Sequence, residues 1–508
     1  MTAEHVDVLI VGAGLSGINA AYHMQTRCPT KSYTILEGRS AIGGTWDLFR
    51  FPGVRSDSDM YTLGYPFRPW TEAKAIAGGP AILKYIRETA EEYGIDRKIR
   101  FGHQVRRATW SSADATWTVE VERGLKEIVQ FTCNFLYMCS GYYDYASGYT
   151  PQWPGVERFA GRIVHPQQWP EDLDYAGKRV VVIGSGATAV TLVPAMAEQA
   201  AHITMLQRSP TYIVTTPSED ATANWLHRHL PTKLAHRMAR WKSILFGIYF
   251  YNLARRRPAF TKQAIMQLVQ QELGPDYDVE THFAPRYDPW DQRLCLVPDA
   301  DLFAAIRSGK VSVVTDHIAT FTETGIQLRS GQELTADIIV TATGLNLRLM
   351  NGVQLVVDGA PMELSRTMSY KGMMYSDMPN LASALGYINA SWTLRSELTA
   401  NYVCRLLSYM DRHGYTQCTP RRPDGSIADK PVLDLTSGYV QRAIDTLPRQ
   451  GSRKPWKIYQ NYARDLLSVR FSRVNDRTME FTRRGERVAR KAREGRAWKP
   501  SFGTGRRR

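Results

Sequence analysis

Two stretches of the chain share one pattern, in which a run of aliphatic residues ends at a glycine-rich loop and a helix-like repeat follows. The first run, Val6–Val11, leads into Gly12, and the second, Arg179–Ile183, leads into Gly184. Wholly aliphatic runs suit parallel strands, because helices cover both faces of a parallel sheet. A glycine-rich turn between such a strand and a helix is typical of a site for the pyrophosphate of a dinucleotide. The pattern predicts an α/β fold with two Rossmann-like dinucleotide-binding domains.

The first loop carries the complete dinucleotide pattern, with Gly12, Gly14 and Gly17 followed by a second apolar strand and Glu37, 20 residues after Gly17. The first glycine allows a tight turn, the second lets the backbone approach the pyrophosphate, and the third lets the helix pack on the strand. A carboxylate at this distance accepts a hydrogen bond from a ribose hydroxyl, which suits an unphosphorylated ribose. This half of the chain is therefore predicted to bind FAD.

The second loop differs from the first at the position that reads the ribose. The strand Ile203–Leu206 is followed by Arg208 and Ser209, where the first unit has an acid. An arginine there suits the 2′-phosphate of NADPH, so NADPH is predicted in preference to NADH. The alternative is an arginine that only caps a helix at the surface. The residues predicted to hold this coenzyme are Gly184, Ser185, Gly186, Thr188, Ala189, Arg208 and Ser209.

Similar apolar strands close the two units, at Phe135–Gly141 and at Ile338–Gly344. The second unit is therefore predicted to be inserted in the first, with a helical insertion that caps the cleft between them. The predicted boundaries are 1–145 and 345–482 for the FAD domain, 146–215 (with the linker) and 292–344 for the NADP domain, 216–291 for the helical insertion and 483–508 for a basic tail.

Charge and apolar runs bear on location and partners. The 508 residues have a formal net charge of +15, and Arg483–Arg508 hold 11 basic and 2 acidic residues. Such a tail is typically solvated, and contact with an anionic membrane is the alternative. Ser243–Tyr251 is apolar but has only about half the length needed to span a bilayer. It is therefore interpreted as a buried helix, and a segment that lies on the membrane surface is the alternative. No nucleic-acid partner is predicted.

The six cysteines form no CxxC pair and show no metal-ligand spacing with histidine. This usage favours a reducing cytoplasm and predicts no metal site. Peripheral contact at the inner face of the cell membrane is an extension that rests on the basic tail and Ser243–Tyr251. The cysteine usage also argues against a flavin disulfide reductase, which needs a redox-active cysteine pair close to its flavin.

Two further motifs indicate a family. The pattern FxGxxxHxxxW is met by Phe159, Gly161, His165 and Trp169, and a second pattern by Gly43, Gly44, Trp46, Phe51, Pro52, Gly53 and Asp57. With these motifs the chain resembles the type I Baeyer–Villiger monooxygenases, which are class B flavoprotein monooxygenases. The resemblance implies that FAD and NADPH are used to insert one oxygen atom of O2 into ketones, and to oxidise sulfides or thioamides, through a C4a-peroxyflavin.

The resemblance also implies roles for single residues. Arg293 and Asp57 are expected to be catalytic, because a guanidinium positioned by a carboxylate can hold negative charge that develops on oxygen. For Arg293 a surface salt bridge is the alternative. His165 is also expected to be catalytic, with a part in domain movement and cofactor handling, and a structural histidine without direct chemistry is the alternative. Residues near the flavin are expected to be Gly44, Thr45, Trp46 and Asp57.

Other functions stay open at this point. One alternative is an N- or S-oxygenating flavin monooxygenase without ketone activity, but such enzymes normally have Tyr or Phe where this chain has Trp169. A second alternative is a basic membrane-associated binding protein, and only the basic tail supports it. Where many relatives have a lysine before the essential arginine, this chain has Gln292. The preference for NADPH then depends on Arg208 and Ser209. The native substrate and the oligomeric state are not specified by any motif.

Overall fold

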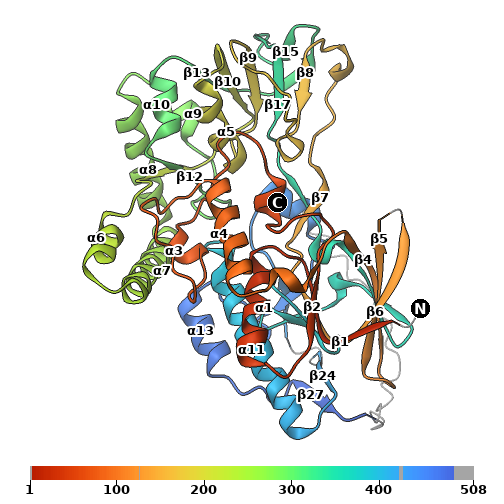
Figure 1. The fold of residues 1–508 in the computed structure, drawn as a ribbon. Helices are drawn as coiled ribbons and strands as arrows, with labels where there is room; N and C mark the ends of the chain where they lie inside the picture. Colours follow the sequence, from red (N-terminus) through yellow and green to blue (C-terminus); the bar gives the residue numbers. More distant parts are fainter. Residues whose placement is uncertain (1–2, 125, 423–426, 485–508) are drawn as a thin grey trace, which may run out of the picture.

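The computed structural model describes residues 3–484, apart from residue 125 and residues 423–426. Two separate β-sheets, each with its own helices and apolar core, lie one above the other in Figure 1. The predicted α/β fold with two dinucleotide-binding units is therefore confirmed.

The larger sheet belongs to the first unit, and its strand order is β20-β19-β4-β5-β6-β1-β2-β3, with β23 beside the end of β6. Strands β1, β2, β3 and β23 run parallel to one another and to β6, whereas β4 and β5 form an antiparallel extension of β6. Because β19, β20 and β23 follow residue 344, the chain returns to this sheet as predicted. The strands are β1 (Glu4–Val11), β2 (Tyr33–Leu36), β3 (Ile99–Arg100), β4 (His103–Ser111), β5 (Thr116–Arg123), β6 (Glu127–Met138), β19 (Gln354–Val357), β20 (Ala360–Met362) and β23 (Leu381–Ser383).

The smaller sheet is parallel throughout, in the order β13-β10-β9-β17-β8. Its central strand carries the aliphatic run of the second glycine loop, and Val180, Val181 and Val182 are fully buried there. Burial on both faces is the reason that this strand has no polar alternation. The strands are β8 (Arg162–Val164), β9 (Arg179–Ile183), β10 (His202–Gln207), β13 (Val311–Thr315) and β17 (Ile338–Thr341).

Both glycine loops turn in the same way at the end of their strands. Gly12 has φ +107° and Gly184 has φ +132°, a region that side chains rarely adopt. A Cβ atom on Gly12 would lie 2.6 Å from the carbonyl oxygen of Cys139, and one on Gly184 would lie 2.3 Å from that of Ala342. Each loop therefore passes tightly under the end of the neighbouring strand, before α1 (Leu15–Arg27) or α5 (Ala187–Ala197) begins.

The two units are joined by two connections that pair with each other. Strand β7 (Tyr143–Gly148) leaves the first sheet, β18 (Leu345–Leu347) returns to it, and the two form an antiparallel ribbon. This two-stranded ribbon is therefore one of the contacts that fix the orientation of one unit against the other, together with the ion pair of Arg55 and Asp301.

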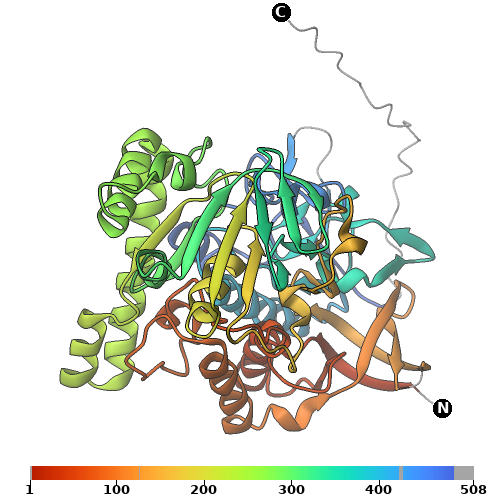
Figure 2. The same cartoon turned by 90° about the horizontal axis from the view of Figure 1, so that it is seen from above.

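The helical insertion projects from one side of the molecule in both Figure 1 and Figure 2. It contains α6 (Ala221–His229), α7 (Thr232–Arg256), α8 (Pro258–Leu273) and α9 (Val279–Phe283). Helix α7 packs on α3 (Met60–Leu63), where the buried guanidinium of Arg240 donates to the carbonyl oxygen of Tyr61 at 2.7 Å and to that of Gly64 at 2.9 Å.

The insertion does not cap the cleft, and this prediction is wrong. All of residues 216–291 are described, and none lines the large cavity between the two units. The reason is the packing of α7 on α3, which holds the helices beside the cavity. The interpretation of Ser243–Tyr251 as a buried helix is also only half correct, since Ile244 is buried but Leu245, Phe246 and Tyr249 are exposed.

Among the residues that the structure describes, no helix combines the length and the apolar character needed to cross a bilayer. All six cysteines are buried and carry free thiols.

Candidate active site

A large cavity of about 1130 Å³ lies between the two units. Both glycine loops line it, from the carboxyl ends of β1 and β9, which is where open parallel sheets bind ligands. Of the predicted cofactor-binding residues, those that line it are Gly12, Gly14, Glu37, Gly44, Thr45, Trp46, Asp57, Gly184, Ser185, Gly186, Thr188, Arg208 and Ser209.

On the side of the first loop, Glu37 is held rigidly at the end of β2. Its carboxylate accepts hydrogen bonds from the backbone N–H of Ala13 at 2.7 Å and of Arg39 at 2.9 Å. Burial raises the pKa of Glu37, and these two donors oppose that effect. The adjacent backbones of Gly14 and Gly44 leave no side chain between the loop and the cavity. This arrangement fits the ribose and pyrophosphate of FAD.

On the side of the second loop, the backbone is open to the cavity. A Cβ atom on Gly186 would meet nothing within 4 Å, so a pyrophosphate has room to approach. Ser185 is oriented by a 2.8 Å hydrogen bond between its Oγ and Oγ1 of Thr211. Arg208 and Ser209 are exposed on the cavity wall, where a ribose phosphate could reach both. The residues fit NADPH.

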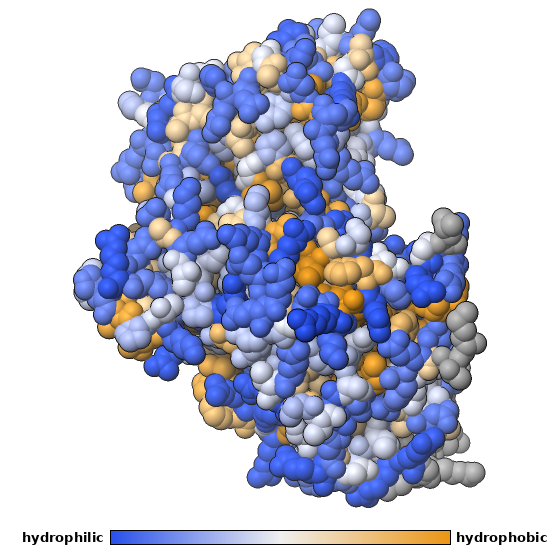
Figure 3. Space-filling view, in the orientation of Figure 1, coloured by the Kyte–Doolittle hydropathy of each residue, from blue (hydrophilic) through white to orange (hydrophobic). Residues whose placement is uncertain are grey.

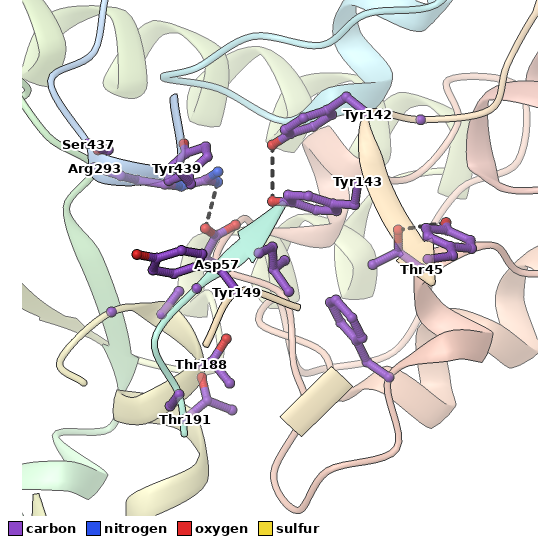
Figure 4. Close-up of a pocket in the computed structure, with 18 of the residues that line it drawn as sticks. Thr45, Asp57, Tyr142, Tyr143, Tyr149, Thr188, Thr191, Arg293, Ser437 and Tyr439 are labelled. Atoms are coloured by element: carbon purple, nitrogen blue, oxygen red, sulfur yellow. Dashed lines mark hydrogen bonds and ion pairs between the residues drawn. The ribbon is translucent and has the colours of Figure 1, made fainter. Parts of the chain in front are cut away.

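Arg293 and Asp57 meet in the cavity between the two loops, as Figure 4 shows. Nη2 of Arg293 lies 2.6 Å from Oδ2 of Asp57, and about a third of each side chain is exposed, 33% and 32% respectively. The carboxylate of Asp57 raises the pKa of Arg293, so the guanidinium stays charged. The two side chains therefore form an ion pair whose guanidinium faces ligand space, which disfavours the interpretation of Arg293 as a surface salt bridge.

Three tyrosines surround this pair (Figure 4). The hydroxyl of Tyr142 donates to the hydroxyl of Tyr143 at 3.0 Å, and Tyr439 hydrogen-bonds to Arg293. Burial raises the pKa of Tyr143 to about 12, so its hydroxyl remains protonated at neutral pH. Because Tyr143 accepts from Tyr142, its own proton is available to a group in the cavity.

The sequence analysis missed these tyrosines. Tyr142 and Tyr143 directly follow Gly141 at the carboxyl end of β6, and residues at that end of a parallel strand are candidates for a ligand site. That signal could have identified them. Tyr439 is 146 residues from Arg293 in the sequence and belongs to no motif, so only the fold brings it to the site.

Three predicted site residues lie outside the cavity. A Cβ atom on Gly17 would be 1.8 Å from the carbonyl oxygen of Gly12, so a side chain there would prevent the close approach of α1 to the first loop. Ala189 is fully buried in the core of the second unit.

His165 is the third, and it contacts the connecting ribbon. Its Nδ1 accepts from the N–H of Gln167 at 3.1 Å, and Nε2 lies 3.2 Å from the carbonyl oxygen of Gly344. A neutral ring with its proton on Nε2 satisfies both contacts, and burial lowers the pKa of His165, which favours that neutral form. A Cβ atom on Gly148 would lie 1.9 Å from the ring, so His165 packs directly against β7.

Comparison with known proteins identifies the family. The family described as flavin-binding monooxygenase-like matches residues 76–350, more than half of the chain, and an NAD(P)-binding Rossmann-like domain matches residues 10–74. The chain belongs to the flavin-binding monooxygenase-like family. The predicted enzyme class, flavin monooxygenase, and the predicted cofactors FAD and NADPH are thereby confirmed.

Relatives of this flavin-binding monooxygenase extend over almost the whole chain. The FAD-containing monooxygenase EthA of Mycolicibacterium smegmatis is 54% identical over 481 residues, which are 94% of this chain and 98% of that protein. Among solved structures, a steroid monooxygenase bound to NADP has a TM-score of 0.73 at 21% identity and covers 94% of this chain and 100% of its own. An open structure of cyclohexanone monooxygenase has a TM-score of 0.73 at 19% sequence identity and covers 94% of this chain and 100% of its own. At these identities the two structures show a shared fold.

Proposed function

We propose that this flavin monooxygenase carries out Baeyer–Villiger oxidation, inserting one oxygen atom of O2 into ketones to give esters or lactones, and that it also oxidises sulfides or thioamides. The observation that carries the proposal is the 2.6 Å pair of Arg293 and Asp57 in the cavity that both glycine loops line. The likeness in fold to steroid and cyclohexanone monooxygenases supports it.

The cofactor, when bound, supplies the electrons that activate O2. The task of the protein is to hold negative charge on oxygen close to the carbonyl carbon. The charged Arg293 provides that field, and Asp57 fixes the direction of its guanidinium. Tyr143 presents a hydroxyl proton for the oxygen of the substrate, since its lone pair already accepts from Tyr142.

Aromatic side chains close one wall of the cavity against water. Tyr142 stacks on Trp392 with ring centroids 5.0 Å apart and an interplanar angle of 9°. The indole Nε1 of Trp392 donates to Oγ of Ser16 at 2.7 Å, which attaches this wall to α1. Exclusion of water strengthens electrostatic stabilisation and suppresses uncoupled side reactions.

The assignment of cofactors to the two units follows the loops. Residues 1–145 and 345–482 are proposed to hold FAD through Gly12, Gly14 and Glu37, and residues 146–215 and 292–344 to hold NADPH. Arg208 and Ser209 are proposed to contact the 2′-phosphate, because they lie beside the second loop on the cavity wall. The buried free cysteines support a reducing compartment, and the cytoplasm is the proposed location.

The test is a panel of ketones and sulfides assayed for NADPH consumption and for product. Ester from ketones in proportion to NADPH consumed is the expected result. Sulfoxide formation with no ester from any ketone would instead establish the N- or S-oxygenating activity. Hydrogen peroxide must be measured in parallel, because uncoupled turnover consumes NADPH without forming product.

A further inference from the structure

Helix α7 carries an exposed apolar stripe along its length. Its members follow one another at spacings of three or four residues, which places them on one face of a helix. Their side chains are between 37% and 65% exposed, and they are Leu234, Met238, Trp241, Leu245 and Tyr249. Phe246, at 67% exposed, lies beside this stripe.

The opposite face of α7 is already occupied. Ala235, His236, Ala239, Arg240 and Ile244 are buried on that side, and α3 is among the elements packed there. A surface helix normally turns a polar face to water, so a second apolar face has no role in the fold itself.

Apolar exposure continues onto neighbouring elements. Trp225 of α6 is 54% exposed. The ring of Trp241 lies 6.0 Å from that of Tyr462, the first residue of α13 (Tyr462–Arg470), and Leu467 and Phe471 at the other end of that helix are 62% and 71% exposed. Figure 3 shows hydrophobic residues among hydrophilic ones at the lower edge of the projecting helices.

Basic residues predominate in this region, and Asp220 and Asp291 at its margins pair with Lys242 and Arg255. Residues 221–270 contain nine lysines and arginines and no aspartate or glutamate, so their net charge is +9. The basic residues are Arg228, Lys233, Arg237, Arg240, Lys242, Arg255, Arg256, Arg257 and Lys262. Within the part of the chain that the structure describes, Arg228, Lys233, Arg237 and Arg256 form no ion pair.

We propose that the exposed face of α6 and α7 docks peripherally on an anionic lipid bilayer. The apolar stripe would enter the headgroup region, and the surrounding basic side chains would contact lipid phosphates, a combination that binds amphipathic helices to anionic membranes. A second copy of the chain fits less well, because the exposed basic side chains Arg228, Lys233 and Arg237 of two such faces would repel each other. Nucleic acid fits less well too, because the aliphatic side chains of Leu234, Met238 and Leu245, which alternate with the aromatic Trp241 and Tyr249, offer a base neither stacking nor hydrogen bonds.

The experiment is co-sedimentation of the full chain with vesicles of phosphatidylcholine alone or mixed with phosphatidylglycerol. One variant, Lys233→Glu with Arg237→Glu, reverses charge beside the stripe, and another, Trp241→Ser with Leu245→Ser, makes the stripe polar. The matched control, Lys310→Glu with Arg329→Glu, reverses two exposed basic residues of the second unit that form no ion pair with a described residue. A chain ending at Arg484 removes most of the basic tail.

Binding to the anionic vesicles is expected to exceed binding to neutral ones by about tenfold or more, and to fall about tenfold in either variant of α7. The control and the shortened chain are expected to bind as wild type does. Flavin content and NADPH oxidation in solution, measured for every variant, separate loss of docking from loss of folding or of the proposed activity.

Three results would overturn the proposal. Wild-type binding by both α7 variants would exclude this face, and loss of binding only in the shortened chain would assign the contact to the tail. A protein that ignores both kinds of vesicle, but whose self-association is abolished by Trp241→Ser with Leu245→Ser, would show that a second copy covers the stripe.

Discussion

The guanidinium of Arg293 is the charge on which the proposed chemistry depends. Replacing it with alanine should lower ester formation by about 100-fold or more, the usual effect of removing a preorganised group that stabilises an oxyanion. Reduction of the flavin by NADPH should persist, because hydride transfer places no negative oxygen beside this residue. Anaerobic stopped-flow reduction, followed by mixing with O2 and ketone, measures the two steps separately.

Two comparisons sharpen this measurement. Asp57→Ala should give a milder form of the same defect, since it removes the partner at 2.6 Å but keeps the charge. Arg286→Ala, at an exposed arginine outside the cavity, should leave the ester yield unchanged. Ester formation at the wild-type rate in Arg293→Ala would remove this residue from the reaction.

Arg208 is the proposed reader of the 2′-phosphate. Losing a charge-assisted contact to phosphate costs about 1.5–3 kcal/mol, so Arg208→Ala should raise KM for NADPH roughly ten- to a hundredfold. KM for NADH should change little, because NADH has no phosphate at that position. Steady-state kinetics with both coenzymes test this, and equal preference for them in the wild type would contradict it.

Tyr143 is proposed to donate its hydroxyl proton to the substrate oxygen. Tyr143→Phe should slow oxygenation about tenfold, the value of one hydrogen bond, without slowing flavin reduction. Burial raises the pKa of this hydroxyl to about 12, so its contribution should not decline as the pH rises from about 7 to about 10. Tyr145→Phe is the matched control, because that hydroxyl also lies on the cavity but pairs with Thr45 at 3.1 Å.

At the scale of elements, the contact of α7 with α3 should make stability depend on pH. His236 is buried there, and burial, followed by Arg240 and His227, lowers its pKa to about 4. Only the unfolded chain then binds a proton as the pH falls from about 6.5 towards 4. Stability is therefore complete above about pH 6.5, and roughly 2 kcal/mol should be lost between about pH 7.5 and about pH 5.

Thermal unfolding at the two pH values tests this effect in His236→Leu. The readout is the difference in Tm between the two conditions, which should shrink in the variant whatever its absolute stability. His413→Gln, at an exposed histidine of α11 (Trp392–His413), should keep the wild-type difference. An unchanged difference in His236→Leu would assign the pH dependence to other groups.

At the scale of the whole molecule, the ribbon of β7 and β18 is one of the contacts that set how the second unit meets the first. His165 packs on Gly148 of β7 and bonds to Gly344, so both connections contact its ring. His165→Ala should retain FAD but slow flavin reduction by NADPH about tenfold, since loss of orientation alone can cost this much. His202→Ala is the control, because His202 begins β10, bonds to Ser312 and lies away from the ribbon. The flavin of this variant should be reduced by NADPH at the wild-type rate.

The sequence determined the features that depend on short stretches of chain. Gly12 and Gly184 must turn where a side chain would strike the next strand, and wholly aliphatic runs must be buried on both faces. Steric and burial requirements of this kind are local. The two Rossmann-like units, and the positions of Glu37 and Arg208 beside the glycine loops, could therefore be predicted from spacing. The pairing of Arg293 with Asp57 came from the family resemblance, and the structure brings the two side chains together.

Only the tertiary structure decided which distant surfaces meet. Tyr439 reaches Arg293 because the chain returns to the first sheet after β18, and no local pattern records that approach. The apolar residues of α7 looked like a core in the sequence, yet α3 covers one face only and Leu245 and Tyr249 stay exposed. Periodicity shows that a helix has apolar faces, but which face is buried depends on what packs against it, and that is settled by contacts between residues far apart in the chain.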